Sequence, residues 1–166
     1  TVTQKTPFVF RILIAVWLVY SLFSIAQYVY QYQSMISGWE KSRKNNVTHQ
    51  ILVSQQYLVD ENLDQLKTVL ENARKLTYFD YWVLQENNVL KDFGGNGTAK
   101  DFDREFIPSD NFYEGPGFAL KTIGVLNYKL TIGITKLSSI QLITHELKYE
   151  SLKFLFDFFM VTFLIV

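Results

Sequence analysis

The apolar residues of the chain are concentrated at its two ends, and the first cluster predicts a membrane-spanning helix. Residues 8–30 are almost wholly apolar, and no charged side chain occurs between Ile12 and Trp39. About 20 such residues in a helix span a hydrocarbon core of roughly 30 Å. A buried helix of a soluble protein rarely stays apolar on every face for so long. A cleaved signal peptide would have a shorter apolar core and a small-residue cleavage site. We therefore expect residues 1–32 to form a cytoplasmic N-terminus and a transmembrane helix.

A second apolar run, residues 154–166, stands at the end of the sequence. Asp157 can pair with Lys153 one helical turn earlier, which suits a helix that enters a membrane from its polar side. The alternative is a C-terminal core helix of a soluble domain. We expect residues 151–166 to begin a second transmembrane helix. Because the chain starts with Thr rather than Met, we also expect it to be a piece of a longer polypeptide.

The orientation follows from the basic residues that flank the first span. Lys5 and Arg11 precede it. Three basic residues follow it: Lys41, Arg43 and Lys44. Long loops translocate largely regardless of their charge, so the short basic N-terminus counts for more. This places Thr1 in the cytoplasm and residues 33–150 outside it.

Beyond the first span, the apolar spacing is helical up to about Leu76. One series repeats at intervals of four, three and four residues: Val47, Ile51, Ser54 and Leu58. A second series over residues 63–76 keeps this rhythm. Capping residues between them indicate that one helix ends near Val59 and the next begins near Glu61. The first series is either the seam of a homodimeric coiled coil or the face that the helix turns to its own domain.

After residue 78 the pattern alternates with period two, which predicts strands. Residues 79–85 and 89–93 read as a hairpin, and 94–117 as a long irregular loop with room for a short helix. Residues 118–126 and 128–134 form a second hairpin. One face of its last strand carries Tyr128, Leu130, Ile132 and Ile134. Ser138 or Ser139 then caps a helix that runs towards the membrane. The expected fold is α+β: an antiparallel sheet with helices on one side.

Composition excludes several classes of function. The net charge is zero and charged residues make up 19%, so a nucleic-acid partner, which needs a basic face, is not expected. Without cysteine there is neither a disulfide nor a cysteine zinc site. No catalytic or phosphate-binding motif occurs, and Asp101–Glu105 lacks the glycine and distal glutamate of a calcium loop. We expect no enzymatic activity in these residues and no metal or cofactor. His145 is either a pH-sensing residue or an ordinary helix-surface histidine.

A ligand would bind at the irregular loop and the neighbouring sheet face. The aromatic and cationic residues that qualify are Tyr81, Trp82, Arg104, Tyr113 and Lys121, a set suited to a carboxylate. Because Tyr81 and Trp82 are adjacent in a strand, they face opposite ways and cannot both line one pocket. The competing interpretation is that the aromatic residues belong to the core and the cations to the surface.

The order of elements resembles the extracytoplasmic PAS-like sensor domains, of the single Cache type, of bacterial transmembrane receptors. The most characteristic segments are Leu63–Leu76 leading into Tyr78–Leu90, and Leu130–Ser139 leading into the exit helix. The resemblance covers about residues 33–150, with fewer residues between the hairpins. It implies a homodimeric sensor in a bacterial plasma membrane. Binding of a small molecule or protein outside would then act through two membrane helices on a cytoplasmic histidine kinase, diguanylate cyclase or chemotaxis-type output.

A second hypothesis comes from another class of protein. An anchored helix with a small α+β domain is also typical of structural components of envelope, pilus or secretion assemblies. In that case the domain would bind other subunits, and it would have no output domain to control.

Overall fold

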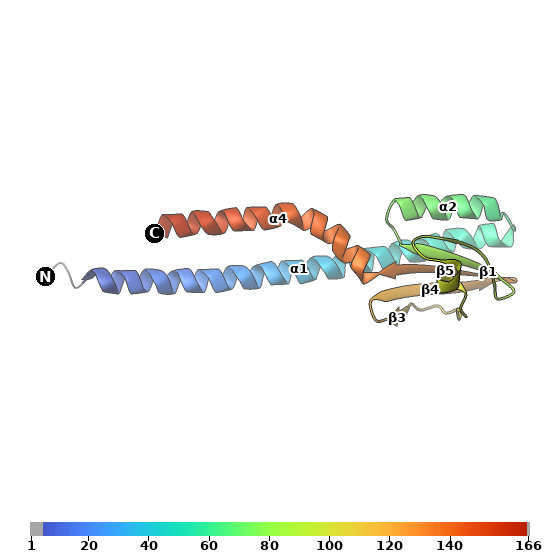
Figure 1. The fold of residues 1–166 in the computed structure, drawn as a ribbon, viewed down its shortest axis with the longest axis horizontal. Helices are drawn as coiled ribbons and strands as arrows, with labels where there is room; N and C mark the ends of the chain where they lie inside the picture. The colour runs from blue at the N-terminus through green and yellow to red at the C-terminus, as the bar shows by residue number, and fades with distance from the viewer. Residues whose placement is uncertain (1–4, 166) are drawn as a thin grey trace. The chain divides into compact units, whose positions relative to one another are not determined.

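The chain folds into two long helices and an α+β domain with a five-stranded antiparallel sheet (Figure 1). The computed structural model describes residues 5–165. The side chains of residues 5–7, 137, 139, 142, 143, 145–147, 149, 150 and 165 lie outside this description. The predicted roles of His145 therefore concern a side chain outside the described part.

The elements follow one another in the predicted order, with one additional strand. Their bounds are α1 (Lys5–Val59), α2 (Leu63–Lys75), β1 (Tyr81–Glu86), β2 (Val89–Gly94), α3 (Ala99–Phe102), β3 (Tyr113–Gly115), β4 (Phe118–Val125), β5 (Tyr128–Thr135) and α4 (Lys136–Ile165). The short strand β3 was not predicted, because three residues are too few to show a period of two.

Helix α1 is long and apolar enough to cross a membrane. Large apolar side chains are exposed over much of its first half, including Val19, Leu22 and Phe23. Among the helices that the structure describes, α1 alone meets this measure, so a second transmembrane helix is not shown. The end of α4 also exposes large apolar side chains, such as Phe159 and Phe163.

The sheet has the strand order β2-β1-β5-β4-β3, and all its neighbours are antiparallel. The two predicted hairpins, β1-β2 and β4-β5, join through β1 and β5 at the centre. Residues 82–85 of β1 and 130–134 of β5 are buried without interruption. Continuous burial of this kind means that both faces of the sheet are covered.

The larger core lies between the sheet and the two helices α1 and α2. Fourteen buried residues form it: Val47, Ile51, Leu58, Leu66, Leu70, Ala73, Phe79, Trp82, Leu84, Ala119, Tyr128, Leu130, Ile132 and Ile134. The smaller core lies on the opposite face, where α3 and the segment after it cover the sheet. It consists of the buried residues Val83, Phe102, Phe106 and Leu120. The helices are therefore not all on one side, because the short helix α3 contributes Phe102 to the second face.

The helical series that allowed two interpretations is buried within the domain. Val47, Ser54 and Leu58 are 0% exposed and Ile51 is 2% exposed. Ser54 satisfies its hydroxyl by donating to the carbonyl of Gln50 at 2.7 Å. This face of α1 thus contacts the chain's own sheet, as the second of the two interpretations requires.

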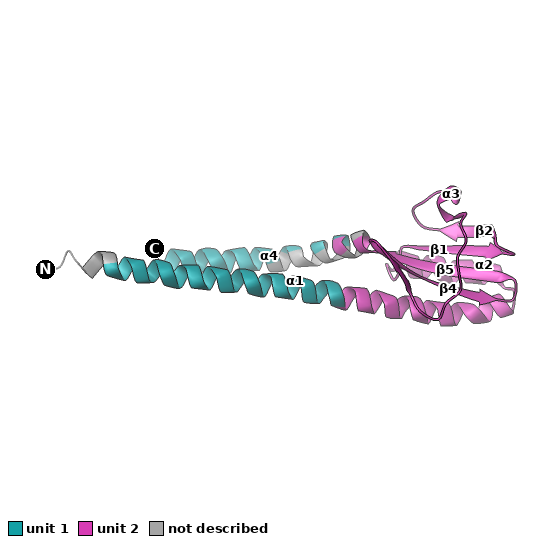
Figure 2. Ribbon diagram, turned by 90° about the horizontal axis from the view of Figure 1, so that it is seen from below, with its two compact units in different colours: residues 1–37, 141–166 teal, residues 38–140 magenta. Residues whose placement is uncertain are grey.

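By its internal contacts the chain divides into two compact units, coloured in Figure 2. One comprises residues 1–37 and 141–166, and the other comprises residues 38–140. The second unit contains the sheet, α2 and the adjoining ends of α1 and α4.

Helix α2 is fastened to the sheet by Glu71. Its carboxylate accepts a hydrogen bond from the indole of Trp82 at 2.8 Å and forms an ion pair with Arg74 at 2.9 Å. The hydrogen bonds from Arg74, with a smaller contribution from the Trp82 indole, hold the pKa of Glu71 below its ordinary value against the opposing effect of burial.

We predict that Glu71→Gln weakens the domain at neutral pH by about 1 kcal/mol. A carboxyl group whose pKa is lower in the folded chain than in the unfolded chain stabilises the fold fully above the unfolded pKa, which is about 4.3 for Glu. This stabilisation is lost as the pH falls through the pKa of the folded state. The difference in unfolding free energy between wild type and variant should therefore shrink below about pH 4. Urea titrations at pH 7 and pH 3 measure it, and an unchanged difference would contradict the prediction.

Candidate functional site

The candidate site is a polar junction at the end of the sheet where α1 enters the domain and α4 leaves it. Arg43 extends the buried face of α1 by one turn beyond Val47, and its side chain is 1% exposed. A guanidinium cannot lose its charge at physiological pH, so a buried one requires compensating acceptors. The remaining residues of the junction supply them.

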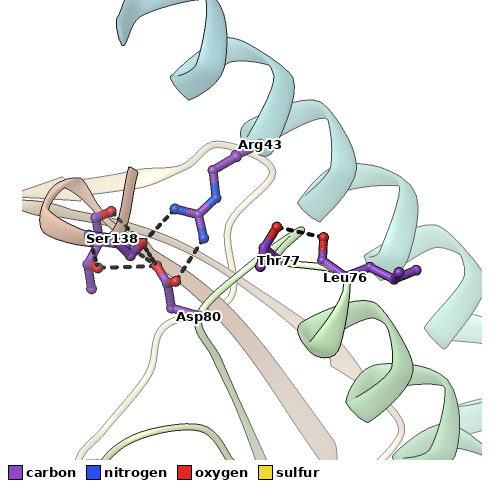
Figure 3. Close-up of polar contacts among 6 residues, drawn as sticks. Arg43, Leu76, Thr77, Asp80 and Ser138 are labelled. Atoms are coloured by element: carbon purple, nitrogen blue, oxygen red, sulfur yellow. Dashed lines mark hydrogen bonds and ion pairs between the residues drawn. The ribbon is translucent and has the colours of Figure 1, made fainter. Parts of the chain in front are cut away.

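Asp80, just before β1, is the centre of the junction (Figure 3). Its Oδ1 accepts a hydrogen bond from Arg43 Nη2 at 2.8 Å. Its Oδ2 accepts from the backbone N–H of Thr135 at 2.6 Å and from the hydroxyl of Ser138 at 2.7 Å. The backbone N–H of Asp80 donates to the carbonyl of Gly133 at 3.0 Å. One carboxylate thus joins α1, β5 and the start of α4.

Ser138 closes the network. Its hydroxyl accepts from Arg43 Nη1 at 2.7 Å while it lies within donating distance of Asp80. Helix α4 begins at Lys136, earlier than predicted, and Ser138 does not cap it. The Thr135 hydroxyl instead accepts from the Ser138 backbone N–H at 3.3 Å. The prediction was wrong because β5 runs into α4 without a loop, so the last strand residue serves as the cap.

A strained turn brings the chain from α2 to Asp80. The backbone N–H of Thr77 donates to the Arg74 carbonyl and that of Tyr78 to the Ala73 carbonyl, which closes a Schellman motif. The motif needs a left-handed residue, usually glycine, but Thr77 occupies the position with φ 61°. For a β-branched residue this costs about 1–2 kcal/mol. Its hydroxyl donates to the Leu76 carbonyl at 2.7 Å, as drawn in Figure 3.

The second face of the sheet holds part of the predicted ligand site. The segment after α3 is fastened there by three bonds: Gln85 to the Arg104 carbonyl at 2.9 Å, Ser109 N–H to the Thr122 carbonyl at 3.0 Å, and Lys129 to the Phe106 carbonyl at 3.2 Å. The Arg104 guanidinium lies 5.0 Å from the ring centroid of Phe106 and 6.0 Å from that of Phe118. We call residues 98–112 the strap.

The predicted ligand residues divide between the two faces. Burial raises the pKa of Tyr81, and the nearby cation of Arg104 opposes this shift, so the Tyr81 side chain lies next to Arg104 of the strap. Tyr113 is on the same face and its ring is 6.1 Å from that of Phe118. Lys121 is on the other face, where its ammonium lies 5.6 Å from the Phe112 ring. Trp82 also points to that face, into the larger core, as the alternation predicts.

The junction residues were missed in the sequence, although a signal was present. Arg43 stands four residues before Val47 and continues a series whose other members predicted a buried face. A charged residue in such a series indicates a buried ionic partner. Nothing in the local pattern identifies Asp80 as this partner, because the two residues are 37 positions apart.

The junction joins α1, β1, β5 and α4 through one set of polar contacts. Within the described part of the chain, no three His, Cys, Asp or Glu side chains are placed to hold a metal ion. What the geometry provides is one rigid polar link between these elements.

We predict that Asp80→Ala lowers the unfolding free energy by about 3–5 kcal/mol, because it leaves the Arg43 charge buried without its counter-ion. Arg43→Met should cost less, since the carboxylate of Asp80 is 24% exposed and keeps its other donors. Asp92→Ala, which removes an exposed ion pair with Lys67 and a hydrogen bond from the backbone N–H of Phe93, should cost about 1 kcal/mol or less.

Urea titration of the full chain in nanodiscs measures these differences. The fluorescence of Trp82 reports unfolding once the other two tryptophans are replaced by phenylalanine. Equal effects of Asp80→Ala and Asp92→Ala would show that the junction is no more than a surface ion pair.

No known protein family, curated protein or solved structure matches this chain in comparisons of sequence and fold.

Proposed function

We propose that this chain is the sensor module of a bacterial transmembrane signalling receptor. In this proposal α1 and α4 are its two membrane helices, and the domain between them lies outside the cytoplasm. The domain converts binding of a small molecule or protein into a change in how α1 and α4 are related. Homodimers of the module would pass that change to a cytoplasmic output domain of the kinase, cyclase or chemotaxis type.

The observation that carries the proposal is the junction at Asp80. A sensor needs a connection between its binding domain and both membrane helices. Asp80 bonds to Arg43 of α1 and to Ser138 of α4, and it immediately precedes β1, which pairs with the central strand β5. A displacement of β1 is therefore felt by both helices through bonds of 2.8 Å and 2.7 Å. A spacer in a structural assembly would not need this link.

The two long helices support a two-span arrangement. Helix α1 is long and apolar enough to cross a membrane. Helix α4 follows β5 without a loop and ends in a run whose large side chains are exposed, among them Phe156, Phe159 and Phe163. Exposed side chains of this size are favourable in lipid and costly in water.

The ligand is proposed to bind at the strap. Arg104 offers an exposed guanidinium beside the aromatic residues Phe106, Phe118 and Tyr81, a combination that recognises a small carboxylate or an acidic peptide side chain. Below the strap, Gln85 of β1 bonds to the Arg104 carbonyl at 2.9 Å. Movement of the strap would thereby act on β1 and, through it, on Asp80. A ligand shifts the equilibrium only if it binds one arrangement better than the other.

A cysteine-free chain permits a direct test of this coupling. Spin labels at Lys41→Cys and Lys148→Cys report the α1–α4 distance in the full chain in nanodiscs. A panel of small carboxylates (acetate, succinate, citrate and amino acids) is first screened by thermal shift. A ligand present at a free concentration of 100 times its Kd raises the unfolding free energy by about 2.7 kcal/mol. We expect it to shift the label distance in wild type but not in Arg104→Gln or Asp80→Asn.

The control is Lys100→Gln, which removes an exposed cation from the strap's short helix and should leave the response unchanged. A binder that raises the melting temperature without any change in the α1–α4 distance would contradict the coupling. If no carboxylate or acidic peptide raises it, the ligand-binding part of the proposal fails and a structural role is favoured.

A further inference from the structure

The unit formed by residues 1–37 and 141–166 contains a groove between α1 and α4. Its volume is about 650 Å³, within the range of small-molecule sites. Thirteen residues line it: Tyr20, Ser24, Gln27, Tyr28, Tyr30, Gln31, Tyr32, Ser34, Met35, Lys153, Phe154, Asp157 and Phe158. Aromatic side chains and polar side chains thus share one cavity.

Specific contacts hold the two helices together at the groove and beyond it towards the start of α1. The Tyr28 hydroxyl lies 2.7 Å from the Ser151 hydroxyl, and the Trp17 indole donates to the Thr162 hydroxyl at 3.0 Å. The Tyr28 ring is 5.3 Å from that of Phe154. These contacts fix the antiparallel register, so the groove is a built feature of the helix pair.

The polar lining is unusual for a segment next to a lipid-facing surface. Gln27 and Gln31 are one turn apart on α1, and Lys153 and Asp157 are one turn apart on α4. Among the residues that the structure describes, these four are not joined to one another by a hydrogen bond or an ion pair. Ionisable and amide groups at membrane depth are costly unless a partner satisfies them.

We infer that the groove binds the zwitterionic phosphoethanolamine headgroup of a phospholipid. The inference rests on the proposed function only in that α4 enters the membrane. Lys153 and the amide N–H groups of Gln27 and Gln31 bind the phosphate, and Asp157 accepts hydrogen bonds from the ammonium group. The rings of Tyr28, Phe154 and Phe158 complete the site for the cation.

The charge pattern selects this headgroup among common lipids. Lys153 and Asp157 are one helical turn apart, about 5.4 Å along the axis, which suits a neighbouring positive and negative group of one ligand. A purely anionic headgroup would meet the carboxylate of Asp157. A trimethylammonium headgroup has no N–H to donate to it. Bound lipid at this position would bias the packing of α4 on α1, so the module would respond to membrane composition.

The test uses the full chain, purified in detergent, stripped of lipid and titrated under native mass spectrometry. The probes are phosphatidylethanolamine, phosphatidylcholine, phosphatidylglycerol and free phosphoethanolamine. We expect phosphatidylethanolamine to be retained about tenfold better than the other two lipids, as one charge-assisted hydrogen bond predicts. Free phosphoethanolamine should bind far more weakly, because it lacks the acyl chains.

Variants of α4 assign the selectivity to the groove. Asp157→Asn should abolish the preference for phosphatidylethanolamine over phosphatidylcholine, and Lys153→Gln should weaken retention of both. Lys148→Gln, an exposed lysine of α4 outside the groove lining, should change neither. Equal retention of all lipids, or a preference that survives Asp157→Asn, overturns the inference. A lipid-free dimer as the dominant species would also overturn the inference, because a second copy of the chain would then satisfy the polar side chains of the groove.

Failure of this inference is distinguishable from failure of the proposed function. Phe163→Cys in nanodiscs should resist a membrane-impermeant maleimide. If it is shielded and no lipid preference is seen, only the headgroup site is wrong. If it is labelled as fast as Lys41→Cys, α4 is outside the bilayer, and both the site and the two-span sensor are overturned.

Discussion

Among the described residues, the guanidinium of Arg43 is the buried charge on which the domain depends. A cation that is 1% exposed in a small domain is tolerable only with fixed acceptors around it. Asp80 and Ser138 provide these acceptors, and each comes from a different element. The position of α1 against the sheet and the start of α4 are therefore set by the same hydrogen bonds.

The two faces of the sheet beside this junction are covered by different amounts of packing. The face towards α1 and α2 is filled by large apolar side chains and fastened by Glu71 and Trp82. The opposite face is covered by the strap, which is held chiefly by three hydrogen bonds and a small aromatic cluster. A ligand that moves the strap would meet less resistance than one that separates α1 from the sheet.

Most of the fold was predictable from the sequence, because it follows from periodicity. The four-three-four spacing of residues 47–58 identified a buried face, and period two identified both hairpins within one or two residues. The spacing alone did not decide whether this face of α1 contacts a second copy of the chain or the chain's own sheet. Burial against the chain's own sheet depends on the pairing of β1 with β5, which is long-range.

The candidate site was less predictable, since it is built from residues distant in sequence. No common motif joins Arg43, Asp80 and Ser138. By its local sequence Arg43 is a charge that follows the first span, Asp80 is a residue of a predicted strand, and Ser138 is a predicted helix cap. Lys121 was grouped with Tyr81 and Arg104 by composition, yet strand alternation turns it to the other face. Long-range pairing of strands determines such groupings, and the local pattern does not specify it.

The coupling of both helices through Asp80 is tested most directly by amide hydrogen exchange of the full chain in nanodiscs, comparing wild type with Asp80→Asn. The account predicts faster exchange in two separate segments, α1 around Arg43 and the first turn of α4 from Lys136, with no change in the middle of α2. Faster exchange confined to the residues next to Asp80 would contradict it.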